Sequence, residues 1–326
     1  MTKDQIVYLV FGIVLVLALL LDLVILNKKD KITTMRQALI QTLFWVGLAL
    51  SFGIFIYFEE GEKGPTMALE YISAYLMEWS LSVDNIFVFI LIFTSFNVKE
   101  KHYGRVLLIG ILMAIIFRAL FITVGVALVD KFHWVLYLFG VFLVYTGYHM
   151  FTTNDDEAFE PHDSKVYKFL NKFLPLAPHD GDGKYVVRDA KGKPQYTTLF
   201  VVVVMLAAID LVFALDSIPA VMGISREKLV IYTSNIFAVL GLRSLFFLLR
   251  GAVSKFDFLQ QGIAIVLVFI GIKMLAEHWI NEWIPSKGIQ VTISLGMILL
   301  CIGGSIVYSI YHKKKYVPHD VDDNTL

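Results

Sequence analysis

The chain has 326 residues, of which 57% are hydrophobic and only 17% are charged, and its mean hydropathy is +0.70. Soluble domains carry about a quarter of charged residues, so this composition indicates a membrane protein rather than a soluble enzyme. The 28 basic and 28 acidic residues give a formal net charge of zero, which excludes the basic surface that nucleic-acid binding requires. The single cysteine, Cys301, excludes an internal disulfide and a thiolate metal cluster.

Long apolar runs recur from one end of the chain to the other, each near the ~20 residues that a helix needs to cross a bilayer. They predict an all-α, polytopic membrane protein with about nine transmembrane helices. The predicted spans are residues 5–26, 37–58, 68–95, 104–129, 132–151, 198–222, 229–250, 257–280 and 288–311. The first run has no small-residue cleavage site, so we expect a retained helix rather than a signal peptide.

Lysine and arginine are concentrated in every second loop, and this predicts the orientation, because cytoplasmic loops of membrane proteins are rich in both residues. The basic loops follow the first, third, fifth, seventh and ninth predicted spans. We therefore expect an inner (plasma) membrane protein with its N-terminus outside the cell and its C-terminus in the cytoplasm.

The segment 152–197 is the only long loop between predicted spans. Within it, residues 185–196 predict a short hairpin around a glycine-containing turn. Pro-His-Asp triplets at 161–163, 178–180 and 318–320 have two interpretations, because His and carboxylate can bind divalent ions and can equally stand in solvated turns.

Two related acidic motifs lie inside apolar runs. Each has an acid, five further residues, an Asp, a small polar residue and an Ile. The motifs read Glu78-Trp-Ser-Leu-Ser-Val-Asp84-Asn85-Ile86 and Asp210-Leu-Val-Phe-Ala-Leu-Asp216-Ser217-Ile218. A charge at bilayer depth costs about 2.5–3.5 kcal/mol on insertion scales, so these acids are expected to be paired or functional.

Further landmarks follow the two motifs in the same order and indicate an internal repeat. Arg118-Ala-Leu-Phe and Arg243-Ser-Leu-Phe lie in the next spans, and Gly147 and Gly271 close the two units. Three spans match three spans, so the units enter the membrane from opposite sides, as in many secondary transporters. The predicted organisation is 1–67, two N-terminal helices; 68–151, the first three-helix repeat; 152–197, the cytoplasmic loop; 198–280, the second, inverted repeat; and 281–326, the last helix and tail.

Acids six residues apart differ by about 240° around a helix, so they cannot share one face. Either each helix breaks at its motif, which Pro219 makes plausible, or only one acid of each pair faces a common site. The available ligands are all oxygens and suit Mn²⁺, Mg²⁺ or Ca²⁺ rather than copper or zinc. The predicted metal ligands are Asp84 and Asp216, with Glu78, Asp210, Asn85 and Ser217 as auxiliary ligands or proton carriers, and Arg118 and Arg243 as charge-balancing residues.

Other interpretations of the acids remain open. Arg118, Arg243 and Lys273 could form static ion pairs with them, although four acids exceed three bases. Transport of protons alone is a further alternative. A catalytic role is not expected, because no Gly-x-Ser-x-Gly or His-Glu-x-x-His motif and no phosphate-binding glycine loop is present. Aspartyl membrane proteases have a glycine before the catalytic Asp, whereas here Asp84 follows Val83 and Asp216 follows Leu215. We also expect no resident cofactor.

With these motifs, the chain resembles the TerC family of integral membrane proteins, most of all the nine-span branch with the Alx-type manganese exporters. The resemblance is clearest from Tyr57 to Trp283 and rests on the two acidic motifs in their order around the loop. It implies metal-ion export, mainly of Mn²⁺, and it implies a site at the motif positions listed above. One departure is Ala207-Ala208-Ile209 before Asp210, where relatives often carry another acid.

The expected function is therefore export of a divalent metal ion, most of all Mn²⁺, by alternating access of two inverted units. The expected partners are that ion and the lipid bilayer, with no nucleic acid. The alternative is a membrane scaffold, or an assembly factor in metal or tellurite resistance, that docks partners through the 152–197 loop. The choice between Mn²⁺ and Ca²⁺, the driving force and the oligomeric state stay open.

Overall fold

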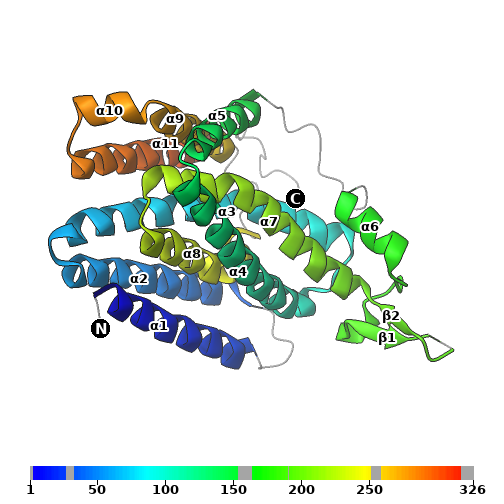
Figure 1. Ribbon diagram of the computed structural model, residues 1–326. Helices are drawn as coiled ribbons and strands as arrows, with labels where there is room; N and C mark the ends of the chain where they lie inside the picture. The colour runs from blue at the N-terminus through cyan, green and yellow to red at the C-terminus, as the bar shows by residue number, and fades with distance from the viewer. Residues whose placement is uncertain (1–2, 27–32, 153–163, 190, 251–257, 317–326) are drawn as a thin grey trace, which may run out of the picture.

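The computed structural model describes residues 3–26, 33–152, 164–189, 191–250 and 258–316. The membrane region consists of long helices, numbered as in Figure 1. They are α1 (Lys3–Leu26), α2 (Met35–Glu59), α3 (Gly64–Ser95), α4 (Glu100–Lys131), α5 (Val135–Thr152), α7 (Thr198–Ile224), α8 (Lys228–Arg250), α9 (Leu259–Leu275), α10 (Glu277–Trp283) and α11 (Lys287–Tyr316). The prediction of an all-α, polytopic membrane protein is confirmed.

Six of the described helices are long and apolar enough to cross a membrane, namely α2, α4, α5, α7, α8 and residues Gly288–Ser309 of α11. A seventh is added if α9 and α10 form one broken span. Helices also lie at the two other predicted spans, α1 and α3. Among the described side chains, the apolar part of α1 is Gln5–Leu21, and α3 is not among the candidate spans. The total of nine spans therefore stays a prediction.

The span predicted at 257–280 does not continue straight. Helix α9 ends at Leu275, and the chain bends by 80° into α10. The sequence of α10, Glu-His-Trp-Ile-Asn-Glu-Trp, is too polar for hydrocarbon, and Trp279 and Trp283 are exposed. Tryptophan beside charged residues is typical of the boundary between membrane and water, which accounts for the bend.

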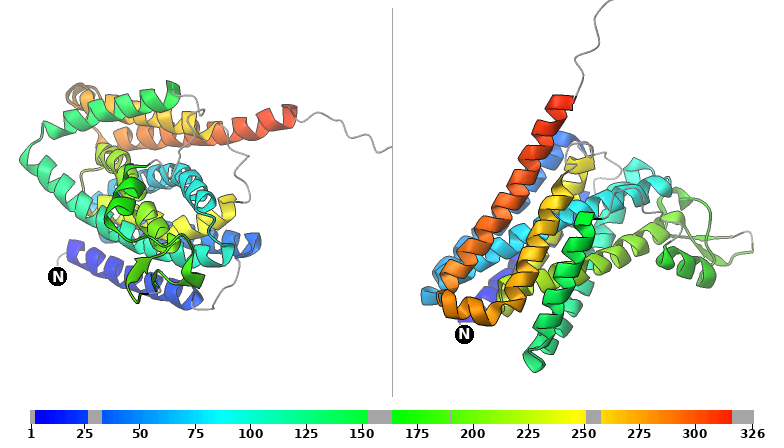
Figure 2. Two further views of the ribbon diagram at one scale, coloured as in Figure 1. Left: turned by 90° about the vertical axis from the view of Figure 1, so that its right-hand side faces the viewer. Right: turned by 90° about the horizontal axis from the view of Figure 1, so that it is seen from above.

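Four helices form the centre of the bundle. Helix α3 packs against α7 and α8, and α4 packs against the same two helices. On one side of this centre lie α1 and α2, and on the other side α5, α9 and α11 (Figures 1 and 2). Each of the two acidic motifs therefore lies on a helix, α3 or α7, that is enclosed by the rest of the bundle.

Glycines bring α5 and α9 into close contact. A Cβ atom on Gly147 would lie 2.6 Å from the carbonyl oxygen of Ala264, and one on Gly271 would lie 2.7 Å from the carbonyl oxygen of Gly140. Small residues allow membrane helices to approach until their backbones touch, and van der Waals packing then replaces the missing hydrophobic driving force.

The segment after α5 contains helix α6 (Lys165–Phe173), which the sequence analysis does not anticipate, and a two-stranded hairpin at the predicted place. Strand β1 (Val186–Arg188) pairs antiparallel with β2 (Pro194–Tyr196), with Val187 opposite Gln195. Gly192 has φ +78° in the connecting turn, a conformation that glycine adopts without a steric penalty.

The turn before this hairpin is attached to the start of α4. Lys99 forms an ion pair of 2.8 Å with Asp180, and Arg105 Nη1 donates to the carbonyl oxygen of Gly183 at 3.3 Å. Of the three Pro-His-Asp triplets, only the one at 178–180 lies within the described residues. There His179 Nδ1 accepts from the amide of Gly181, so this triplet builds a turn.

Substitution of Gly147 by alanine is expected to lower the melting temperature, because overpacking a tight contact costs about 1–3 kcal/mol. The matched control is Gly303→Ala on α11, where an added Cβ meets nothing within 4 Å. Alanine is favoured over glycine in a helix by about 0.5–1 kcal/mol, so the control should melt at the same temperature or higher. Thermal unfolding of the purified protein in detergent measures both, and equal melting temperatures would contradict the close contact.

Substitution of Asp180 by asparagine is expected to speed tryptic cleavage at Lys184 about twofold to fivefold at pH 7, the scale of a surface ion pair. The control is Asp182→Asn, because the Asp182 pair with Lys101 is long, 3.9 Å, and Asp182 is 89% exposed. The Lys99 ammonium lowers the pKa of Asp180 below its ordinary value. The stabilisation of the turn is therefore present at neutral pH and is lost as the pH falls below about 4, the ordinary Asp pKa. Equal cleavage of the two variants at pH 7 would show that the pair does not hold the turn.

Candidate functional site

Both acidic motifs lie in continuous helices. Helix α3 runs without a break through Glu78 and Asp84, and α7 runs through Asp210 and Asp216 with Pro219 inside it. The alternative of a broken helix is therefore wrong, and the two acids of the α7 motif lie on different faces. On α7, Asp210 is 1% exposed and faces α4, whereas Asp216 is half-buried and accepts from Thr146 Oγ1 of α5 at 3.3 Å.

Arg118 of α4 is the centre of a buried ionic network. Its Nε and Nη2 atoms donate to the two carboxylate oxygens of Asp210, at 2.7 and 2.9 Å. Its Nη1 atom forms an ion pair with Glu78 of α3 and donates to Asn235 Oδ1 of α8 at 3.2 Å. The planar guanidinium suits such a two-pronged contact, so four helices are joined at one side chain.

Asn235 is a member of this network that the sequence analysis does not select. Its Nδ2 atom donates to the carbonyl oxygen of Ile231 one turn earlier at 3.1 Å, which directs Oδ1 towards Arg118. The side chain is fully buried in α8. In the sequence, Asn235 is a carboxamide within an apolar run. This pattern alone does not distinguish a residue that binds a charged group from one that only packs between helices.

The network has more negative than positive charge. Arg118 carries one positive charge against the two carboxylates of Glu78 and Asp210, and all three side chains are at most 1% exposed. The Oε2 atom of Glu78 is buried, and no hydrogen-bond partner for it is found among the described residues. Burying a charge without a counter-charge is costly, so a surplus carboxylate of this kind is suited to binding a proton or a cation.

The remaining predicted site residues are placed only in part. Asn85 and Ser217 are buried on α3 and α7, and Arg243 is buried on α8. The side chain of Asp84 lies outside the described residues. Among the residues that are described, no group of three or more His, Cys, Asp or Glu side chains is arranged to hold a metal ion. The predicted pairing of Asp84 with Asp216 therefore stays a prediction.

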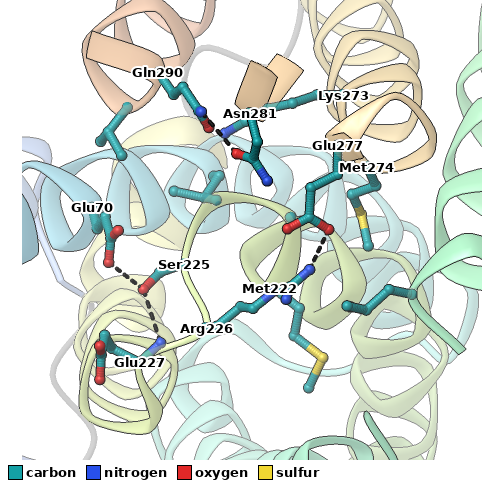
Figure 3. A pocket seen from close by; sticks show the side chains of 14 residues that line it. Glu70, Met222, Ser225, Arg226, Glu227, Lys273, Met274, Glu277, Asn281 and Gln290 are labelled. Carbon is teal, nitrogen blue, oxygen red and sulfur yellow. Dashed lines mark hydrogen bonds and ion pairs between the residues drawn. The ribbon is translucent and has the colours of Figure 1, made fainter. Parts of the chain in front are cut away.

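A polar cavity of about 150 Å³ lies at the opposite end of α7 from the hairpin (Figure 3). Its lining residues come from α3, α5, the end of α7 and its connection to α8, the α9–α10 bend, and α11. Those that carry charge are Glu70, Arg226, Glu227, Lys273 and Glu277. Three acids and two bases leave this cavity with one surplus negative charge, as in the buried network.

Most polar groups of the cavity are bound to one another. Ser225 Oγ donates to the carboxylate of Glu70, and Arg226 forms an ion pair with Glu277. Lys273 Nζ donates to Ser294 Oγ at 3.0 Å. Glu70 precedes Glu78 on α3 by eight residues, about 12 Å along the axis, so the cavity and the network share a helix.

Replacement of Arg118 by glutamine is expected to destabilise the protein by about 3–5 kcal/mol, because it leaves two buried carboxylates without a counter-charge. Glu78→Gln is the matched control, since it keeps the Arg118–Asp210 pair and removes the surplus charge. This control should melt at the wild-type temperature or higher. A Glu78→Gln protein as unstable as Arg118→Gln would contradict the charge count.

The chain is similar to known membrane proteins over most of its length. The model of the integral membrane protein TerC family matches residues 63–316, most of the chain. An uncharacterized membrane protein of Rickettsia bellii is 39% identical over 92% of this chain and 97% of its own length, and one of Myxococcus xanthus is 38% identical over 95% and 94%. The Escherichia coli protein named "Putative membrane-bound redox modulator Alx" is 35% identical over 88% and 89%. No solved structure matches the chain. The chain is thus a multi-pass integral membrane protein of the TerC family.

Proposed function

We propose that this protein exports divalent metal ions, chiefly Mn²⁺, by alternating access of two inverted three-helix units, and that it has no catalytic activity. The observation that carries the proposal is the buried network of Glu78, Arg118 and Asp210, which has one carboxylate more than it has cations. Intramembrane acids in such a position typically mark the pathway of a cation or a proton.

Helix contacts support the inverted repeat. In the proposed repeat, α3 corresponds to α7 and α4 corresponds to α8. The α3–α8 contact therefore has its equivalent in the α7–α4 contact, and both contacts are present. Gly147 meets Ala264 and Val268, whereas Gly271 meets Gly140 and Val144. Gly140 and Val144 lie 124 residues before Ala264 and Val268, and Gly147 lies 124 residues before Gly271. Equivalent residues of the two units therefore make equivalent contacts. Reciprocal contacts of this kind are typical of a two-fold axis.

The ligand set follows from the partners of each acid. Both oxygens of Asp210 are occupied by Arg118, so Asp210 serves mainly as a counter-ion. Asp216 keeps one weak contact of 3.3 Å with Thr146 and is the better ligand. Together with Asp84, and with neutral oxygens from Asn85 and Ser217, it forms the proposed site. An all-oxygen site suits Mn²⁺, Mg²⁺ or Ca²⁺.

Arg118 has a defined part in this proposal. When a cation enters near Glu78, the second oxygen of that carboxylate can turn towards the ion, while Arg118 keeps Asp210 neutralised. When the cation leaves, a proton on Glu78 removes the surplus charge. With the proposed orientation, the cavity at Glu70 lies on the outer side and provides the exit for the ion, and the 152–197 loop lies in the cytoplasm.

A redox role like the one in the name of the Alx relatives would need chemistry other than an internal disulfide. The chain has a single cysteine, Cys301, so it cannot form a disulfide within itself. The network of acids and Arg118, by contrast, is suited to cations. We therefore favour ion transport.

Asp84→Asn and Asp216→Asn should each reduce Mn²⁺ flux at least tenfold, because each removes one anionic ligand from the proposed site. Flux is measured in proteoliposomes with an Mn²⁺-quenched dye inside, at pH 6 and pH 8 to test for protons as the counter-ion. Asp130→Asn is the control, since Asp130 is 58% exposed and pairs with Lys228 at a helix end. Wild-type flux in both motif variants would refute the proposed site.

The scaffold alternative is tested with the same assay. Replacing residues 152–197 by a flexible linker should leave flux measurable if the helices alone transport the ion. Loss of manganese tolerance in cells, with full flux in proteoliposomes, would instead favour a docking function of the loop.

A further inference from the structure

Helix α6 lies outside the predicted spans and has two distinct faces. At 100° per residue, its three lysines fall within about 60° of one another, and Phe169 and Phe173 lie directly beside them. The lysines are Lys165, Lys168 and Lys172. The remaining apolar residues, among them Leu170 and Tyr167, continue the arc away from the lysines. A short helix with a basic face and an aromatic edge is typical of helices that lie in a membrane surface.

One part of the apolar arc fixes α6 against the bundle. Leu170 is buried, and the ring of Tyr167 lies 5.4 Å from that of Phe96, which caps the end of α3. Helix α6 also packs against α7. Since α3 ends here and α7 begins nearby, α6 lies at the end of the bundle, next to the hairpin (Figure 1). The ends of membrane-spanning helices are where the bilayer surface is expected.

The other part of the arc faces away from the bundle. Phe169 and Phe173 are 61% and 62% exposed, and their ring centroids are 4.7 Å apart. The Lys172 ammonium lies 5.6 Å from the centre of the Phe173 ring, so charge and ring form one continuous edge. Exposing two adjacent phenyl rings to water is unfavourable. At a membrane surface, the rings can contact acyl chains while the lysine ammonium groups contact lipid headgroups.

We propose that α6 is an interfacial helix that binds anionic lipid. Phe169 and Phe173 insert between the acyl chains at the membrane surface, and the three lysines contact lipid phosphates. The partner is lipid rather than protein because the membrane surface is already adjacent to α6 and because the basic face complements anionic headgroups. This inference concerns the attachment of the loop and stands independently of the transported ion.

The experiment places a fluorophore on α6 in the full-length protein. Cys301→Ser removes the native cysteine, and Phe173→Cys carries an environment-sensitive label. The protein is studied in lipid nanodiscs that contain phosphatidylglycerol, because a water-soluble quencher can reach both faces of a nanodisc. We expect blue-shifted emission, quenching by nitroxide on the lipid chains and protection from iodide. The control label at Lys191→Cys, on the exposed hairpin turn, should show the reverse.

Three results would overturn the proposal. A Phe173 label that is quenched by iodide as strongly as the Lys191 label would show that α6 lies in water. Protection from both quenchers would show that protein covers it. The triple variant Lys165→Gln, Lys168→Gln, Lys172→Gln should reduce lipid quenching in phosphatidylglycerol discs to the level seen with phosphatidylcholine alone, and unchanged quenching would exclude headgroup binding.

Discussion

A fully buried guanidinium that must satisfy two carboxylates and a carboxamide sets the geometry of this protein. Arg118 joins α3, α4, α7 and α8, and each donor nitrogen has a defined acceptor. A slip of one helix by a single turn, about 5.4 Å, would separate at least one charged pair. The glycine contact between α5 and α9 is different, because it depends on backbone proximity rather than on directed bonds. Directed bonds to Arg118 therefore fix the register of the helices at the centre of the bundle, whereas close backbone packing positions α5 and α9 at its side.

The apolar runs of the sequence predict the helices well, because a backbone inside the bilayer must satisfy its own hydrogen bonds and a helix is one of the few structures that does so. The same reasoning could not select the partner of Arg118, since four acids were available and Asp210 is 92 residues away. It also left the helix break at Pro219 open, because a proline interrupts a membrane helix only if the surrounding helices let it. Helix α6 is not predicted because only the hairpin and the turns of the 152–197 loop were considered, although its nine residues have a clear amphipathic pattern. The span predicted at 257–280 does not include the bend after Leu275, and the polar sequence of α10 lies partly inside it.

The two polar regions of the bundle lie on the same pair of helices. On α3, Glu70 faces the cavity and Glu78 faces Arg118; on α7, Met222 lines the cavity and Asp216 lies six residues earlier, about 9 Å along the axis. Family membership and relatives described as membrane proteins agree with a function inside the bilayer. Under the proposed function, the ion would pass between α3 and α7, with the surplus carboxylate near the middle of this route and the cavity at its end.

The order in which the charged residues appear along the chain has a consequence for biogenesis. Glu78 and Arg118 lie in the successive helices α3 and α4, so this ion pair can form before the second half is synthesised. Asp210 arrives later, on α7, and finds its counter-charge already in place. Arg118 is thus bound within the first half before it is shared with the second, and the surplus negative charge of this network appears only when both halves have assembled.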